Sequence, residues 1–133
     1  SFLLMTLIFY YFGVNALLLF LLQSVVAIVL LEAINYIEHY GLLRKKRFGD
    51  RYEPVDICHS WNSNYFLSNW ILLHLPRHSD HHKNMGKPFN KLSSIQRAPQ
   101  LPLGYPAMIL IAFFPFIFIS MMNNILAKYE IKI

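Results

Sequence analysis

Residues 2–31 read FLLMTLIFYYFGVNALLLFLLQSVVAIVLL, an apolar stretch long enough to decide the fold class. Its clearly polar residues are Thr6, Asn15, Gln23 and Ser24. One helix of this length would measure about 45 Å, whereas the hydrocarbon core of a bilayer is about 30 Å thick. Gly13-Val14-Asn15 favours a turn, so the sequence predicts a transmembrane helical hairpin over 1–38, with spans over about 1–12 and 15–37. A single steeply tilted helix is the alternative.

The composition also indicates an integral-membrane protein rather than an ordinary soluble domain. The 133 residues are 56% hydrophobic, 16% aromatic and 14% charged, where about 25% charged is usual. The single cysteine, Cys58, cannot form an internal disulfide, which agrees with a reducing compartment. No basic region precedes Phe2 and no small-residue cleavage site follows, so a signal peptide is not expected. Because the chain opens on Ser1 directly before an apolar run, we expect it to be the C-terminal part of a longer protein, with its first span truncated.

The net charge of +5 is concentrated in the middle of the chain. Ten of the twelve basic residues fall there: Arg44, Lys45, Lys46, Arg47, Arg51, Arg77, Lys83, Lys87, Lys91 and Arg97. A basic block beside apolar spans marks the cytoplasmic side of a membrane. We therefore predict that residues 39–104 are cytoplasmic and that Arg44–Arg47 lies at the lipid headgroups. These residues belong to no nucleic-acid-binding motif, so no nucleic acid is expected as a partner.

Polar residues gather where the second predicted span ends. Glu32, Asn35 and His39 lie at i, i+3 and i+7, so they share one face of a helix. Polar groups this close to a membrane are costly unless they meet partners or a water-filled cavity. The pattern favours a site at the cytoplasmic end of the span, with His39 as a metal ligand and Asn35 beside it. Gly41 fits the end of that helix.

The strongest motif for chemistry is Arg77-His78-Ser79-Asp80-His81-His82. Its three imidazoles lie at i, i+3 and i+4, on one face of a helix. Imidazole without thiolate suits iron, zinc, copper or nickel, and is a poor match for calcium or magnesium. We therefore predict His78, His81 and His82 as metal ligands, with His39 as the fourth. The alternative for the three is a solvated histidine-rich turn.

Two carboxylates lie beside these histidines in the sequence, and we predict that they are not metal ligands. Asp80 is two residues from both His78 and His82, about 200° round a helix, so it points away from their metal. It is better suited to accept the free ring N–H of some other histidine. The same role is predicted for Glu38, next to His39. For both, a salt bridge to Arg77 or a nearby lysine is the alternative.

The remaining histidines are predicted to lie outside the ligand set. His59, in the motif His59-Ser60-Trp61-Asn62-Ser63-Asn64, has no ligand partner at helical spacing. Its neighbours suit hydrogen bonding and packing near a site. His74 lies four residues before His78, on the same helical face, but Pro76 disturbs the register between them.

The predicted fold is an all-α membrane protein, in which the hairpin leads into a helical, histidine-rich cytoplasmic region. Within that region we expect a helix over 61–82, interrupted near Pro76, and a loop over 83–99. An apolar segment over 105–122 is marginal in length for a span and either crosses the membrane or lies embedded at its surface. Residues 105–133 are therefore predicted to be a membrane-associated C-terminal segment.

Four motifs follow one another along the chain: Asn35-Tyr36-Ile37-Glu38-His39-Tyr40-Gly41, His59-Ser60-Trp61-Asn62-Ser63-Asn64, Arg77-His78-Ser79-Asp80-His81-His82 and Leu101-Pro102-Leu103-Gly104-Tyr105. In this order they closely resemble the C-terminal half of the bacterial alkane 1-monooxygenases, from about residue 14 to residue 115. The His-x-x-His-His box alone would fit the whole superfamily of membrane fatty-acid desaturases and hydroxylases. Asn-Tyr-x-Glu-His-Tyr-Gly is much narrower.

The resemblance implies a six-helix-type enzyme of the bacterial inner membrane that hydroxylates alkanes at the terminal carbon with O2. Such enzymes hold two non-haem irons with nine histidines, and the matching positions here are His39, His78, His81 and His82. The other five belong to upstream boxes, His-Glu-x-x-His and Glu-His-x-x-Gly-His-His, which this chain lacks, so the fragment alone is expected to be inactive. His74 and Pro76 stand where the family would carry glutamines.

The same resemblance implies rubredoxin as the electron donor, itself reduced by rubredoxin reductase. This donor is acidic in general, so the basic region Arg44–Arg97 is expected to steer it. Two other functions stay open. A membrane fatty-acid desaturase or a methyl-aromatic hydroxylase would use the same histidines, and a non-catalytic membrane zinc or copper protein could use a four-histidine site. Metal analysis separates the last, because only the enzyme should hold about two irons.

Overall fold

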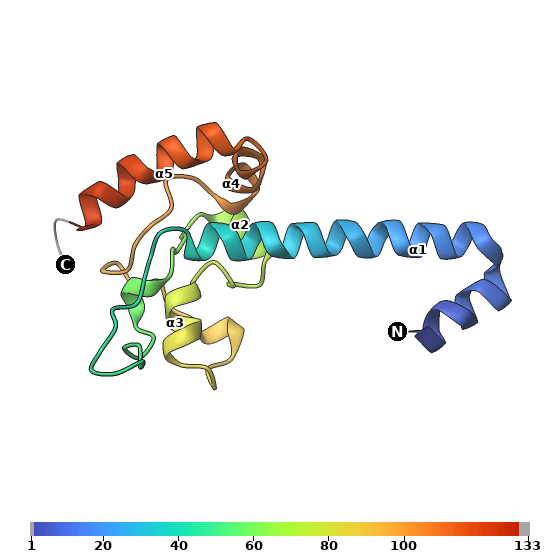
Figure 1. Cartoon of the computed structure of the whole chain (residues 1–133), viewed down its shortest axis with the longest axis horizontal. Coiled ribbons are helices and arrows are strands. Elements are labelled where there is room, and N and C mark those ends of the chain that lie inside the picture. Colours follow the sequence, from blue (N-terminus) through green and yellow to red (C-terminus); the bar gives the residue numbers. More distant parts are fainter. Residues whose placement is uncertain (1, 131–133) are drawn as a thin grey trace. The chain divides into compact units, whose positions relative to one another are not determined.

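The computed structural model describes residues 2–130, and it is helical, with no β-strand within that range (Figure 1). Its helices are α1 (Phe2–His39), α2 (Phe66–Ile71), α3 (His78–Lys83), α4 (Tyr105–Ala112) and α5 (Pro115–Glu130). Short 3-10 turns cover Ile57–His59 and Phe89–Lys91. The predicted all-α class is confirmed for the described part of the chain. Ser1 of the first predicted span and residues 131–133 of the predicted C-terminal segment lie outside the described residues.

The chain forms two compact units, one ending at Ala33 and the other beginning at Ile34. The first unit contains most of α1, which is interrupted at Gly13, where φ is 79° and ψ is −179°. The predicted break therefore lies at this glycine, and Figure 1 shows the sharp bend there. Within residues 2–130, α1 is the one helix long and apolar enough to cross a membrane. Whether its two parts form two spans stays a prediction.

In the second unit, Trp61 closes the C-terminal end of α1. Its backbone N–H donates to Glu38 O at 2.8 Å and its indole Nε1–H donates to Tyr40 O at 2.7 Å. Glu38 belongs to the last turn of α1 and Tyr40 directly follows the helix, so no intrahelical donor reaches either carbonyl. Gly41 then turns the chain with a φ of 72°, a conformation that L side chains rarely adopt. The helix thus ends with His39 in a defined place.

Asn62, the next residue, holds the start of α3. Its Oδ1 accepts the backbone N–H of Ser79 at 3.0 Å, and its Nδ2 donates to Ser79 Oγ at 2.6 Å. The backbone of Asn62 pairs with the segment before α4, since it donates to Pro99 O and accepts from Leu101 N, both at 2.8 Å. The motif at 59–64 therefore joins α1, α3 and α4.

The core of this unit lies between the end of α1 and the α4–α5 pair. Its buried residues are Ile37, Trp61, Leu101, Tyr105, Met108, Phe118, Met122 and Leu126. They come from the end of α1, from the loop residues Trp61 and Leu101, and from α4 and α5, so no single helical pattern in the sequence identifies them. Burial of such side chains contributes about 1.5–3 kcal/mol apiece, so this cluster stabilises the arrangement that positions the histidines.

The predicted helix over 61–82 is wrong for the residues before α2 and for those between α2 and α3. The backbone N–H groups of Trp61, Asn62 and Ser63 bind carbonyls of distant segments instead of a helical turn. After α2, Leu73 and His74 have positive φ values of 48° and 63°, which a right-handed helix does not allow. Pro76 contributes no N–H, and the helix resumes only at His78.

Gly41 provides a test of this packing, with Gly49 as its matched control. Both have positive φ, so alanine should cost about 1–2 kcal/mol of backbone strain at either position. A Cβ at Gly41 would also meet the side chain of Leu126, whereas a Cβ at Gly49 would meet nothing within 4 Å. Gly41→Ala should therefore lower the thermal unfolding temperature of the purified protein in detergent more than Gly49→Ala does. An equal loss would contradict the close approach of Leu126 to Gly41.

Candidate metal centre

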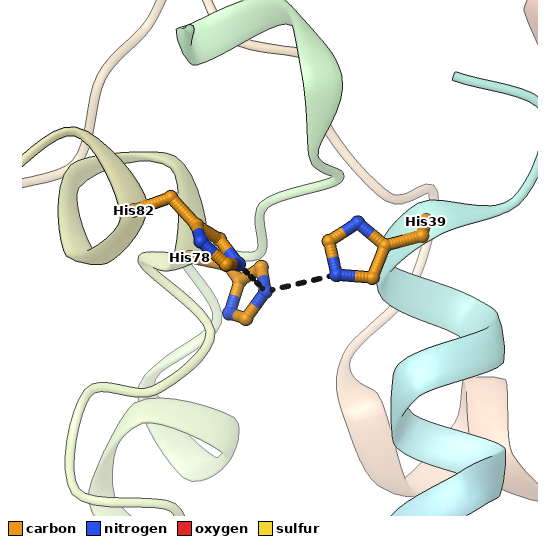
Figure 2. A group of neighbouring side chains, drawn as sticks. All are labelled: His39, His78 and His82. Carbon is orange, nitrogen blue, oxygen red and sulfur yellow. Dashed lines mark hydrogen bonds between the residues drawn. The ribbon is translucent and has the colours of Figure 1, made fainter. Parts of the chain in front are cut away.

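Three histidines from two distant helices meet at the end of α1. His39 is the last residue of α1, and His78 and His82 lie one turn apart on α3. One ligand nitrogen from each lies within 4.8 Å of those of the other two. Figure 2 shows the His78 ring between its partners: its Nε2 is 2.8 Å from His82 Nε2 and 3.4 Å from His39 Nε2.

These separations suit a transition-metal ion. Bonds of about 2.1 Å to imidazole nitrogen place neighbouring ligand nitrogens roughly 3.0–3.4 Å apart in octahedral or tetrahedral geometry. The Nε2 contacts of His78, at 2.8 and 3.4 Å, are close to that range. The donor set is all nitrogen, which favours iron, zinc, copper or nickel. The three rings therefore fit one metal ion.

His81, which is also predicted as a ligand, lies beside this group but is not one of the three convergent residues. Its ring centroid is 6.0 Å from that of His78 and 5.7 Å from that of His82. The group borders a cavity of about 450 Å³, which is lined by His39, Leu42, Leu43, Arg44, Tyr52, Val55, His59 and His82. There is thus space beside His39 and His82 for further ligands.

In the rings of His78 and His39, the nitrogen that faces away from the other histidines, Nδ1, lies near an oxygen atom. His78 Nδ1 lies 3.3 Å from Glu38 Oε1, and His39 Nδ1 lies 3.4 Å from the carbonyl oxygen of His59. An oxygen near Nδ1 favours the tautomer that carries its proton there. Nε2 is then left with its lone pair toward the other histidines, which is the state a metal ligand needs. Glu38 was predicted to lie near the ring N–H of a histidine other than its neighbour His39, and its carboxylate lies near Nδ1 of His78.

Tyr105, at the start of α4, fixes this carboxylate from the other side. Its hydroxyl donates to Glu38 Oε1 at 2.8 Å, and both side chains are almost fully buried. The backbone N–H of Tyr105 in turn donates to Ser68 Oγ at 2.9 Å. The sequence assigned no role to Tyr105, and the one signal was its place at the end of the motif Leu101–Tyr105.

The surroundings of His78 and His82 keep these two imidazoles neutral. Burial, together with the nearby His82, His39 and His81, lowers the pKa of His78 to about 3. Burial also lowers the pKa of His82, and its histidine neighbours lower it further. Both imidazoles are therefore uncharged at neutral pH, so no proton must be removed from Nε2 before it binds a metal.

Among the described residues the Asp80 carboxylate makes no hydrogen bond to a histidine ring, and it forms a salt bridge to Lys87, the kind of contact given above as the alternative. Its carboxylate accepts from Asn84 Nδ2 at 2.7 Å, from Lys87 Nζ at 2.6 Å and from the Ser93 backbone N–H at 2.7 Å. Burial opposes ionisation of this carboxyl group, but these three donors together hold its pKa below the ordinary value. Asp80 thus fastens the loop after α3.

Asn35, which was predicted to lie beside His39, is exposed on α1.

The two histidines predicted to lie outside the ligand set are engaged elsewhere. His59 Nδ1 accepts the Asp56 backbone N–H at 2.9 Å, and its Nε2 lies 3.0 Å from Glu53 Oε1. His74 lies between α2 and α3, and its Nδ1 accepts from Arg77 Nη1 at 3.0 Å. Neither belongs to the convergent group of three.

Comparison with known proteins finds a family and several relatives for this chain. Residues 1–122 match the fatty acid desaturase family. Alkane 1-monooxygenase 1 of Pseudomonas aeruginosa is 43% identical over 118 residues, which are 89% of this chain and 31% of that protein. Alkane 1-monooxygenase 1 of Alcanivorax borkumensis is 51% identical over 94 residues, or 71% of this chain and 23% of that protein.

A more distant relative is named for other substrates. The hydroxylase component of the xylene/toluene monooxygenase of Pseudomonas putida is 29% identical over 80 residues, or 60% of this chain and 20% of that protein. The chain spans less than a third of the length of each of these relatives. The similarity therefore describes one part of such proteins.

We predict that the convergent histidines bind the metal. In the full-length protein, His78→Ala or His82→Ala should weaken iron binding by more than about 100-fold, because even groups that only orient a ligand contribute about 10–100-fold. His74→Ala is the matched control and should bind as the unmodified protein does. The measurement is iron per protein by mass spectrometry, with a chelator competition for affinity. Unchanged iron in His82→Ala would refute the site.

A separate prediction concerns Tyr105. Tyr105→Phe removes only the hydroxyl that holds Glu38, so iron affinity should fall by about tenfold. Tyr65→Phe is the control, because it also loses one hydrogen bond, from its hydroxyl to Pro102 O, without touching Glu38. Chelator competition measures the affinity, and thermal unfolding of the metal-free protein measures any general loss of stability. Equal iron affinity in the two variants would show that Tyr105 does not act through Glu38.

Proposed function

The chain belongs to the fatty acid desaturase family, and we propose that it forms part of the metal centre of an alkane 1-monooxygenase in a bacterial inner membrane. The observation that carries the proposal is the convergence of His39, His78 and His82, from two of the motifs that resemble those enzymes. Identities of 43–51% to several alkane 1-monooxygenases support it. In this proposal residues 39–104 face the cytoplasm.

The proposed centre holds two irons, with His39, His78, His81 and His82 as this chain's ligands. The remaining ligands would come from outside this chain, which spans about a third or less of its relatives' length. The space beside His39 and His82 is where they could approach.

When bound, the irons supply the redox chemistry that activates O2, which no side chain can provide. The overall reaction converts an alkane, O2, two electrons and two protons into a 1-alkanol and water. The chain's own residues position the centre: the Glu38 carboxylate, 3.3 Å from His78 Nδ1, favours the tautomer protonated at that nitrogen, and the Tyr105 hydroxyl holds Glu38. The backbone of His59 does the same for His39. The apolar helix α1 would place this centre beside the membrane, where an alkane dissolves.

Rubredoxin, reduced by its reductase, is the proposed electron donor. The support is electrostatic, because the basic residues Arg44 to Arg47 are exposed and close in sequence to His39. Opposite charge raises the rate of encounter with an acidic protein, and the effect weakens as salt rises.

The alternative functions differ in substrate or in metal. The hydroxylase component from Pseudomonas putida supports a methyl-aromatic substrate, but at 29% identity it is well below the alkane enzymes. A fatty-acid desaturase would share the family and the histidines. A non-catalytic zinc or copper protein would bind a different metal. Product analysis and metal analysis of the full-length protein distinguish all three.

The proposed activity predicts that His78→Ala, His81→Ala and His82→Ala each abolish terminal alkane hydroxylation, because each removes a nitrogen that no other side chain replaces. His74→Gln should leave activity nearly unchanged, since His74 bonds to Arg77 away from the convergent rings. The assay is conversion of octane to 1-octanol in cells that supply rubredoxin and its reductase. Full activity in His81→Ala would remove it from the ligand set, and an inactive His74→Gln would show that the wrong histidines were chosen.

A further inference from the structure

The corner between α4 and α5 exposes an unusually apolar surface. Its exposed side chains are Leu110, Phe113, Phe114, Phe116 and Ile117, and Phe116 is 91% exposed. No Asp, Glu, Lys, Arg or His occurs between Arg97 and Lys128. A contiguous apolar surface of this kind marks an interaction site. We call residues 110–117 the apolar corner.

Both ends of the α4–α5 pair are attached to the same end of α1. On the α4 side, Tyr105 binds Glu38. On the α5 side, the hydroxyl of Tyr40 donates to Asn123 Oδ1 at 2.9 Å, and Leu126 packs at Gly41. The chain therefore leaves the end of α1 and returns to it.

The contacts of α5 also give the direction of the corner. Leu126 lies at Gly41, Asn123 at Tyr40, and Phe118 against Tyr36, with ring centroids 5.0 Å apart. Moving toward the N-terminus of α5 thus moves toward lower residue numbers of α1.

Neither helix of the pair is long enough to cross a membrane. The 8 residues of α4 and the 16 residues of α5 measure about 12 Å and 24 Å, against a hydrocarbon core of about 30 Å. The second half of α5 also carries Asn123, Asn124 and Lys128. A crossing would place these polar residues in lipid.

Part of the backbone of the corner is hydrogen-bonded within the α4–α5 turn. Phe114 N–H donates to Ile111 O at 2.9 Å, and the N–H groups of Ile117 and Phe118 donate to Phe114 O at 3.0 and 3.1 Å. Pro115 has no N–H to satisfy. Chain that enters lipid must pair its backbone polar groups internally, and the N–H groups of Phe114, Ile117 and Phe118 are paired in this way.

We propose that α4 and α5 form a re-entrant membrane element, whose apolar corner inserts among lipid acyl chains and whose two ends stay on the cytoplasmic side. The ligand chemistry is that of acyl chains rather than headgroups, because the corner carries no cation. The element anchors Tyr105, and through it Glu38, at a fixed depth relative to the membrane. The inference goes beyond the proposed enzyme activity and rests only on its membrane location.

The test uses the full-length protein in phosphatidylcholine vesicles, with Cys58 and any cysteine outside this chain replaced by Ser. A nitroxide label at Phe116→Cys is compared with one at Phe48→Cys for relaxation by O2, which concentrates in lipid, and by a neutral nickel chelate, which stays in water. Phe48 is the matched control, since it is also a fully exposed phenylalanine but lies between Arg47 and Asp50. Sidedness is read by reacting Lys83→Cys and Lys128→Cys with a membrane-impermeant maleimide in spheroplasts and in inverted vesicles.

We expect O2 to exceed the nickel chelate at position 116, the reverse at position 48, and labelling of positions 83 and 128 from the same side. Nickel accessibility at 116 equal to that at 48 would place the corner in water. Protection of 116 from both reagents would show that protein covers it, either another part of the full-length chain or a second copy. Labelling of 83 and 128 from opposite sides would show a span. Each of these three contrary results would overturn the re-entrant element but not the membrane location of the protein. Release of the protein by alkaline carbonate would overturn the membrane location itself.

Discussion

The hydrogen bonds from Trp61 to the end of α1 are the constraint on which the candidate centre depends. They satisfy two carbonyls, those of Glu38 and Tyr40, that a helix terminus leaves without intrahelical donors. A buried indole that reaches back to a helix end is costly to move, because both its apolar ring and its N–H would lose their partners. Trp61 thereby sets where α1 stops, and Asn62 beside it sets where α3 begins.

Glu38 and His39 are adjacent in sequence but contact different nitrogens of the His78 ring. Successive residues on a helix point about 100° apart, so Glu38 faces the buried side and His39 faces the histidine cluster. His78 is consequently approached at both nitrogens by the same turn of α1: Glu38 at Nδ1 and His39 at Nε2. One helical turn thus sets both the orientation and the surroundings of the His78 ring.

Local patterns explain what could be predicted from the sequence. The apolar run, the glycine break and the spacing of His78 and His82 are all properties of short segments, and the structure contains the helices that they predict. Tyr105 could not be found this way, because its contact with Glu38 joins residues 67 apart with no shared periodicity. The prediction that a helix begins at Trp61 was wrong for the same reason, since the backbone N–H groups of residues 61–63 bind carbonyls far away in the sequence. A helical angle predicts that Asp80 points away from the metal, but its partners depend on the path of the loop to Ser93.

The shortness of α3 shows why those distant contacts matter. A helix of six residues cannot be stable in isolation, because a single turn repays little of its nucleation cost. Its start is held by Asn62 through Ser79, and its middle by Asp80, which ties it to Lys87 and Ser93. Ser79 and Asp80 lie between His78 and His82 in sequence, so the residues between the histidines hold the helix while the histidines face the cluster. The alternation of polar anchors and imidazoles in Arg77–His82 is therefore a structural requirement of the site as well as its donor set.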